Sequence, residues 1–477
     1  MKKIILSFGM FVALASVGYA QSNTTTINQS TGESNTLNIE QTGQNLNANI
    51  NQTGATTIGN SAEIIQTGTG SSAVIFEKGK RNDVIIEQTN GATASHIANV
   101  NVAGNGSDDN IVTVTQAGKS MEADIDVLGD RNNLTVTQSN DKNRASIQLT
   151  TTALNDDNTI SITQMGQRGQ AYANVDGDRN EVTVMQDGLD NRIGDFGAPG
   201  TTVTTTFAAG TPGAGSIIGV GNVAVAANTG INIIGDDNTV SVTQTAGTKD
   251  NQVAIQLNGA GSDDNSATVN QSGTANGNTA IITVAAGSQY NTATINQANT
   301  ISGMMNVPSN LLPGPGRNNS AAIEQSGDFD VATINQTGRS NNAVIRQLDA
   351  TFVGVNTATI NQPGTFNNAY VEQSGVNGST ATITQNKNQG TVAVFQRGDG
   401  GHTANITQNS NFSGARLVLL QNGFNNSTTL VQTDQNYSQA PDFELIQNGS
   451  NNVTTGINQS GAIRRITQTG NNNTFNY

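Results

Sequence analysis

The chain alternates apolar and polar residues in short segments that end in glutamine. The segment from Ala358 to Gln362 reads Ala-Thr-Ile-Asn-Gln, so the two apolar residues and the glutamine occupy every second position. Side chains of a β-strand alternate between its two faces, which places Ala, Ile and Gln together. The apolar residues recur at period two and not at the 3.6-residue period of a helix. The pattern predicts short strands joined by turns rich in Gly, Asn, Asp and Ser.

The same unit recurs along most of the chain, most often about every 11 residues. Its glutamines are predicted to stack into a structural ladder, because stacked amides can hydrogen-bond to one another and so tolerate burial. The predicted ladder residues are Gln29, Gln41, Gln52, Gln116, Gln138, Gln164, Gln186, Gln244, Gln271, Gln297, Gln325, Gln336, Gln347, Gln362, Gln373, Gln385, Gln396 and Gln408.

A longer period is visible in the middle of the chain. Glutamine stands at Gln88, Gln116 and Gln138, whereas Val102 and Val127 occupy the equivalent place between them. Odd and even strands therefore differ, and the simplest explanation is a rung of two strands and two turns that repeats every 22 to 28 residues. The predicted fold class is all-β, a β-solenoid of stacked strand-turn-strand rungs.

Two further columns support in-register stacking. An asparagine stands six residues before several of the glutamines, at Asn110, Asn132, Asn158, Asn180, Asn238 and Asn265. An aspartate stands two residues before each asparagine, at Asp108, Asp130, Asp156, Asp178, Asp236 and Asp263. The residue between them alternates in charge through Asp109, Arg131, Asp157 and Arg179, so stacking would make opposite charges neighbours.

Residues 1–20 are predicted to be a secretory signal peptide, with two lysines, a short apolar run and small residues before Gln21. Repeats of the apolar-x-Gln unit are predicted at 21–193, 236–298 and 318–477. The Gly-, Thr- and Pro-containing segment 194–235 and the Pro-rich segment 299–317 are predicted to be insertions that project from the solenoid. The alternative is that they divide the solenoid into three blocks.

Composition favours ordered repeats over several globular cores. Only 34% of the 477 residues are hydrophobic and 4% are aromatic, and Cys and Trp are absent. So few large apolar groups cannot fill the two or three cores that the length alone suggests. The lack of cysteine excludes disulfides, thiol catalysis and thiolate metal sites. The net charge of −14 argues against nucleic acid as a partner.

Candidate catalytic chemistry is sparse. The two histidines, His96 and His402, lie far apart in the repeats, and a Ser-His-Asp site would need one beside an acid and a nucleophile. We interpret both as residues of repeat turns, and we predict no catalytic residue and no cofactor.

Aspartates of the turns are the candidates for a metal site, because Ca²⁺ prefers oxygen ligands. They are Asp108, Asp109, Asp156, Asp157, Asp236, Asp237, Asp263 and Asp264. The Gly-rich signature of calcium-binding solenoids is missing, and Asp and Asn favour turns without a metal. We therefore expect turn formation and no bound metal.

The repeats resemble those of curlins, the subunits of curli fibres, which have the form Gln-x-Gly-x-x-Asn-x-Ala-x-x-x-Gln. Residues 336–347 and 362–373 match it fully, and 325–336 match it except for Asp330 at the asparagine. The resemblance implies a secreted subunit that leaves through an outer-membrane export pore. It also implies self-association, or association with other curlin-like subunits, into the functional amyloid of the biofilm matrix.

The number of repeats is several times that of familiar curlins, so alternatives stay open. The chain could cap, nucleate or decorate fibres, or act alone as an adhesin on host or matrix surfaces. Outward rows such as Thr292, Thr294 and Asn296 could contact polysaccharide. A glycan-cleaving solenoid is the enzyme alternative, but no pair of acids stands out from the uniform repeat.

Overall fold

The computed structural model describes residues 22–29, 32–53, 57–91, 95–102, 107–127, 129–149, 155–193, 203–206, 222–225, 230–257, 261–273, 277–299, 319–348, 354–409, 415–433, 442–458 and 464–476. These residues form β-strands and turns and contain no helix. Accordingly, no helix in this part of the chain is long and apolar enough to cross a membrane. The predicted signal peptide and residues 300–317 of the predicted Pro-rich insertion lie outside the described residues.

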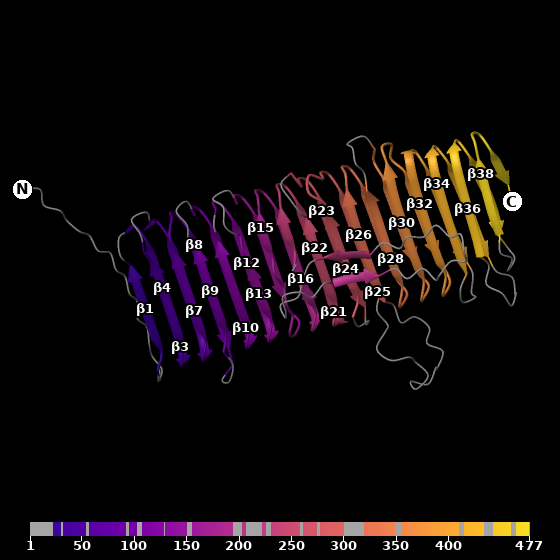
Figure 1. The fold of residues 1–477 in the computed structure, drawn as a ribbon. Coiled ribbons are helices and arrows are strands. Elements are labelled where there is room, and N and C mark those ends of the chain that lie inside the picture. The colour runs from indigo at the N-terminus through magenta and orange to yellow at the C-terminus, as the bar shows by residue number, and fades with distance from the viewer. Residues whose placement is uncertain are drawn as a thin grey trace, which may run out of the picture. The chain divides into compact units, whose positions relative to one another are not determined.

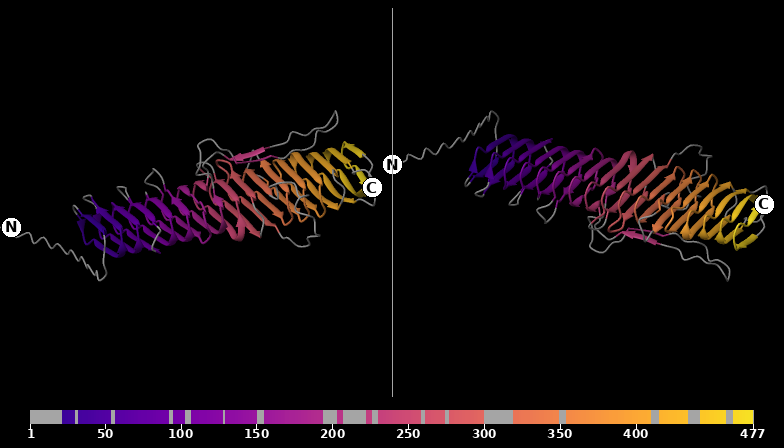
Figure 2. Two further views of the ribbon diagram at one scale, coloured as in Figure 1. Left: turned by 90° about the horizontal axis from the view of Figure 1, so that it is seen from below. Right: turned by 90° about the horizontal axis from the view of Figure 1, so that it is seen from above.

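The chain divides into two compact units, one of residues 1–168 and 174–179 and the other of residues 169–173 and 180–477. Each unit is a β-solenoid in which successive strands alternate between two parallel sheets (Figure 1). The two sheets of a unit form facing layers (Figure 2). We call the sheet whose strands carry most of the glutamines the glutamine sheet, and the other the partner sheet.

In the first unit, each sheet has six stacked strands, listed here in stacking order. Those of the glutamine sheet are β3 (Thr36–Gln44), β6 (Ser61–Thr69), β8 (Asp83–Asn90), β10 (Ile111–Lys119), β12 (Asn133–Asp141) and β14 (Thr159–Gln164). Those of the partner sheet are β1 (Thr24–Gln29), β4 (Asn47–Gln52), β7 (Ser72–Glu77), β9 (Ile97–Val102), β11 (Glu122–Val127) and β13 (Arg144–Ile147). The short strands are β2 (Gly32–Glu33), β5 (Thr57–Ile58) and β15 (Asn174–Asp176).

The second unit repeats the arrangement over more rungs. Its glutamine sheet contains β16 (Glu181–Leu189), β21 (Thr239–Lys249), β23 (Ser266–Gly273), β25 (Thr292–Asn299), β27 (Val331–Gln336), β29 (Thr357–Gln362), β31 (Thr380–Gln385), β33 (Thr403–Asn409), β35 (Ser427–Thr433), β37 (Val453–Asn458) and β39 (Thr474–Asn476). Its partner sheet contains β17 (Arg192–Ile193), β20 (Asn232–Ile234), β22 (Gln252–Leu257), β24 (Thr279–Val284), β26 (Ser320–Ser326), β28 (Asn342–Leu348), β30 (Asn368–Gly375), β32 (Thr391–Gly400), β34 (Arg416–Phe424), β36 (Asp442–Ser450) and β38 (Arg464–Thr469).

The alternation of the sequence sets the core. In β10, Val112, Val114 and Gln116 are fully buried, whereas Thr113 and Thr115 between them are half-buried on the outer face. Fully burying one Val or Ile side chain contributes about 1.5–3 kcal/mol, and the inward positions of both sheets repeat this burial in every rung. The core is therefore a narrow apolar column closed by glutamines.

Neighbouring strands pair in the register that the sequence predicts. Gln116 lies opposite Gln138, and Gln336 lies opposite Gln362. A slip of one residue would turn every inward Val, Ile and Gln to the solvent, so the alternation itself holds the register. The predicted fold class, an all-β solenoid of two-strand rungs, is confirmed within each unit.

The predicted insertion 194–235 is described only in part. Within it, β18 (Val203–Thr206) and β19 (Asn222–Val225) form an antiparallel pair, and β20 at its end lies in the partner sheet of the second unit. The predicted boundaries of the repeat blocks and insertions stay predictions.

Two glycines of the repeat motif are explained by close packing of successive turns. A Cβ at Gly338 would lie 1.7 Å from the carbonyl oxygen of Gly364, and a Cβ at Gly364 would lie 1.9 Å from that of Lys387. The Gly364 oxygen also accepts a hydrogen bond from the side chain of Asn341 at 2.8 Å. The glycine of the motif thus lets one turn sit directly on the next.

We predict that Gly364→Ala lowers the free energy of unfolding by at least about 2 kcal/mol, because two backbones must separate. Gly91→Ala is the matched control, since a Cβ at Gly91 meets nothing within 4 Å. Urea denaturation followed by circular dichroism measures both variants. Equal stability of the two would contradict the packing argument.

Candidate functional site

The glutamines of the glutamine sheet form a continuous side-chain ladder in each unit. In the second unit, the Nε2 of Gln297 donates to the Oε1 of Gln336 at 2.9 Å, and Gln336 donates to Gln362 at 2.9 Å. The first unit has the same ladder, for example from Gln116 to Gln138 at 2.9 Å. Every one of these bonds runs from a donor to the acceptor of the next higher rung, so the ladder has a direction.

Gln336 shows how a ladder amide is satisfied although it is buried. Gln336 accepts one hydrogen bond through Oε1 and donates two through Nε2, the second to the backbone oxygen of Ser320 at 3.1 Å. Ser320 begins β26, the preceding strand, which lies in the opposite sheet, so the amide also ties the two sheets together. A buried amide without these partners would cost about 1–3 kcal/mol per unsatisfied group.

The partner sheet carries a second ladder in the second unit. Gln325 donates to Gln347 at 3.0 Å, and the ladder continues through Gln373, Gln396, Gln421 and Gln447 to Gln468. Rungs in this part of the chain are therefore held by two amide ladders, whereas valines stand at the equivalent position of β9 and β11 in the first unit.

Most of the predicted ladder residues lie in these bonds. Gln41 and Gln52 also donate to neighbours, and Gln29 lies opposite Gln52 in the register but is exposed. The sequence analysis missed ladder members that the same apolar-x-Gln pattern would have found: Gln66, Gln421, Gln432 and Gln447.

A second polar spine lies at the start of the glutamine-sheet strands. The Oδ1 of Asn82 accepts the backbone N–H of Asn110 at 3.0 Å, and Asn110 serves Asn132 in the same way at 2.9 Å. In the second unit, three other residue types stand in this column in place of asparagine. Each still accepts the backbone N–H of the next rung through its side chain: Asp330, Ser379 and His402.

His402 belongs to this spine, and His96 belongs to the corresponding column at the start of the partner-sheet strands. The Nδ1 of His402 accepts the backbone N–H of Asn426 at 3.2 Å, and its Nε2 lies 2.9 Å from the oxygen of Arg397. His96 makes the corresponding contacts with Met121 and Thr89. Burial lowers the pKa of both imidazoles, so each ring is neutral and imitates an asparagine side chain. These contacts assign both histidines a structural role.

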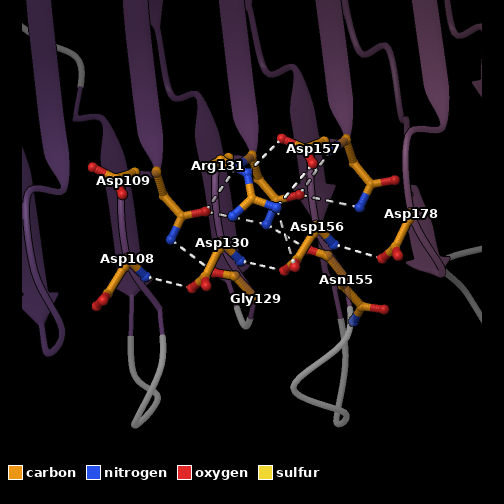
Figure 3. Close-up of polar contacts among 12 residues, drawn as sticks. Asp108, Asp109, Gly129, Asp130, Arg131, Asn155, Asp156, Asp157 and Asp178 are labelled. Atoms are coloured by element: carbon orange, nitrogen blue, oxygen red, sulfur yellow. Dashed lines mark hydrogen bonds and ion pairs between the residues drawn. The ribbon is translucent and has the colours of Figure 1, made fainter.

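The aspartate column of the first unit is a chain of side chain-to-backbone bonds (Figure 3). Asp130 accepts the N–H of Asp108 at 2.8 Å, Asp156 accepts that of Asp130 at 2.7 Å, and Asp178 accepts that of Asp156 at 2.9 Å. Each carboxylate therefore fixes the turn of the rung before it.

Opposite charges stack beside this column, as the sequence predicts. The Nε of Arg81 lies 2.6 Å from Asp109. Figure 3 shows the next such pair, in which the Nε of Arg131 lies 2.7 Å from Asp157. The hydrogen bonds from these arginines lower the pKa of Asp109 and Asp157. Both pairs are solvent-exposed, so they mark the register more than they stabilise it.

The turn aspartates already have partners in the solenoid. Asp108, Asp156 and Asp263 accept backbone N–H groups, and Asp264 lies beside the hydroxyl of Tyr290 and raises its pKa. Within the described residues, no group of three or more His, Asp or Glu side chains could hold a metal ion. Asp236 and Asp237, the other calcium candidates, are therefore not part of such a group.

Glu77 is a carboxyl group inside a ladder. It is fully buried in β7, opposite Gln52 and Val102, and accepts a hydrogen bond from Gln52 at 2.5 Å. Burial raises the pKa of Glu77 to about 8. Its second oxygen is buried without a hydrogen-bond donor, as is the oxygen of Gln52. Glu77 is therefore held in its neutral form.

The comparison with protein families identifies the repeat. The model of the curlin associated repeat matches residues 156–188, 316–348 and 356–386. These matches confirm the resemblance to the curlin-repeat family: the chain carries curlin repeats, on a β-solenoid fold. A comparison with curated proteins gives no match. Curlin repeats stacked in this way fit a curli-like structural or adhesion protein.

We predict that Gln336→Ala lowers the free energy of unfolding by about 2–5 kcal/mol, because it leaves Gln297 and Gln362 short of partners and opens a cavity. Thr333→Ala removes a half-buried outward side chain of the same strand and should cost no more than about 1 kcal/mol. Urea denaturation compares the two variants. Similar losses would show that the ladder amides add nothing specific.

Glu77 makes stability depend on pH. Its pKa is 4.5 in a model peptide and about 8 in the fold, so the folded state binds the extra proton between these values. The stabilisation is complete below pH 4.5 and is lost as the pH rises through 8. Glu77→Gln should remove this slope, as measured by urea midpoints across that range. Parallel pH profiles of the variant and the parent protein would overturn the assignment.

Proposed function

We propose that the chain is a secreted structural protein that builds curli-like amyloid fibres of the biofilm matrix by end-to-end addition of rungs. Support comes first from the uniformity of the rungs. Strand register, amide ladder and asparagine spine are the same from one rung to the next within a unit, so a rung of a second copy could continue them.

The end strands carry the proposal. Ile27 of β1 and Ile466 of β38 are partly exposed, whereas their equivalents in the next strands, Ile50 and Leu445, are fully buried. Within the described residues, β1 pairs with β4 and β38 pairs with β36, each on one side. An unpaired edge beside exposed apolar groups templates the addition of another strand.

The direction of the ladders favours head-to-tail addition. Gln468 accepts from Gln447 through Oε1 at 2.7 Å, and its Nε2 faces the backbone oxygens of Val453 and Asn473. An added β1 would bring Gln29 into the position of the next acceptor. Because every ladder bond points the same way along the chain, two copies could not continue the ladder by joining at the same end.

Arg465 is compatible with this growth. It forms an ion pair at 2.7 Å with Glu444 of the preceding strand, so its charge is partly balanced within the unit. The curlin resemblance further supports an outer-membrane export pore, other curlin-like subunits and host or matrix surfaces as partners. No enzymatic activity is proposed.

A second candidate function is that of a non-polymerising adhesin that binds polysaccharide. The outer face of the glutamine sheet supports it with a row of side-chain amides at the spacing of the rungs: Asn270, Asn296, Asn335 and Asn361. Beside it runs a row of threonines that includes Thr294 and Thr333. Such regular polar rows could contact a repeating glycan.

Assembly of the mature chain, residues 21–477, distinguishes the two candidates. Fibre growth is followed by thioflavin fluorescence, and fibre diffraction should show the spacing of about 4.7–4.8 Å that stacked strands produce. A chain that stays monomeric while its spectrum shows β-structure would favour the adhesin.

A charge at the terminal strand tests the mechanism. Ile466→Lys places a charge where the next rung must pack, and we expect at least a tenfold slower elongation. Thr467→Lys adds the same charge to the exposed outer face of the same strand and should elongate like the parent protein. Equal rates for the two variants would contradict end-to-end addition at β38.

A further inference from the structure

The outer face of the partner sheet in the second unit carries a row of apolar residues. The third residue of each strand points away from the core, and the register aligns these residues from β22 to β34. We call this row the apolar stripe; it consists of Ala254, Ile281, Ala322, Val344, Tyr370, Ala393 and Val418. The same row in the first unit is mostly polar: Asn49, Val74, Asn99, Asp124 and Ser146.

The stripe is buried although it points outward. Ile281 and Val344 are completely inaccessible, and Val418 is 8% exposed, whereas Asn99 and Asp124 in the equivalent row of the first unit are exposed. Tyr370 also packs against Phe395 with ring centroids 5.4 Å apart. An outer sheet face that buries its side chains must be covered by other parts of the chain.

The strand pair β18–β19 lies over part of the stripe. It crosses the outer face of the partner sheet and contacts β22, β24 and β26 (Figure 1). Its register brings Val203 opposite Val225 and Thr205 opposite Val223. We call this pair the strap; it covers the end of the stripe that contains Ala254, Ile281 and Ala322.

The strap is inserted into a single strand of the solenoid. β17 places Ile193 opposite Val253, and β20 places Asn232 opposite Gln256. Only two residues would be needed to join β17 and β20 into one continuous strand on β22. The solenoid therefore does not need the strap to complete this rung.

We propose that the strap is the resident occupant of the end of the apolar stripe that contains Ala254, Ile281 and Ala322, and that it prevents a second copy of this chain from pairing there side by side. Flat sheets with apolar outer faces stack on one another at about 10 Å. The first unit avoids such stacking with polar residues such as Asp124, and the second unit avoids it with a cover. This goes beyond the proposed fibre growth, since it concerns the sides of the solenoid and not its ends.

Deletion of residues 195–230 tests the proposal. It joins Gly194 to Ile231, which supplies the two residues that continue β17 into β20. The parent protein and the deletion variant in this comparison both carry Ile466→Lys, so that growth at the β38 end is suppressed. By sedimentation velocity, the deletion variant should have at least twice the mass of its parent, with a severalfold increase in fluorescence of an apolar dye. Unchanged mass and fluorescence would overturn the proposal.

A reversal identifies the surface that associates. In the deletion variant, Ile281→Asn and Val344→Asn give the stripe the polarity of Asn99 and should restore the mass of the parent. Thr294→Asn and Thr333→Asn, on the outer face of the glutamine sheet, should leave the association unchanged. Association that survives the changes at Ile281 and Val344 would place the contact elsewhere and refute the role of the stripe.

A variant with the strap intact covers the case in which the deletion does not fold. Ile281→Asn and Ala322→Asn in the full chain should loosen the strap, so that protease cleaves between residues 195 and 230 at least tenfold faster. The changes at Thr294 and Thr333 are the control. Equal cleavage rates would show that the strap does not rest on the stripe. None of these outcomes depends on fibre growth at the ends.

Discussion

The buried glutamine ladder is the interaction on which the rest of this solenoid depends. A primary amide can accept one hydrogen bond from the rung before it and donate to the rung after it while its second proton ties the two sheets together, as Gln336 does. This requires every rung to place its glutamine at the same height and depth. The strict alternation of the strands, the glycine-containing turns and the asparagine spine all serve that one geometric requirement.

The ladder also explains how a chain with so few large apolar residues stays ordered. The apolar column contributes burial, but it is narrow, and 34% hydrophobic composition leaves little else to bury. Directional amide bonds add specificity that a hydrophobic column lacks, because an amide out of register loses its partners and the cost of its burial remains. Glu77 shows the limit of substitution: a carboxyl group fits the ladder only in its neutral form.

The sequence predicted the parts of the structure that repeat. Period-two alternation predicted the strands, the alternation of Gln116 with Val127 predicted two unlike sheets, and the charges of Arg131 and Asp157 predicted the in-register stack. Members such as Gln66 were missed although they carry the same motif.

The burial of the apolar stripe was beyond the reach of pattern alone. Ile281 reads as an outward residue, yet it is fully buried, and the strands β18 and β19 that contact its strand are distant in sequence. Likewise, the raised pKa of Glu77 follows from the depth of its site and not from its neighbours in sequence.

The two units thus share one internal construction and differ in how their outer faces are kept from associating. In the proposed growth, end strands such as β1 and β38 offer an edge to a further rung, while polar rows or the strap protect the sides. A solenoid with these properties is suited to linear growth.

Hydrogen exchange of the glutamine side-chain amides, measured by NMR, tests the central claim most directly. The account predicts that the Nε2 protons of Gln297, Gln336 and Gln362 exchange at least a thousandfold more slowly than those of the exposed Gln29. Exchange at the same rate as Gln29 would show that the amides are not bonded to one another, and would contradict the ladder as the basis of the fold.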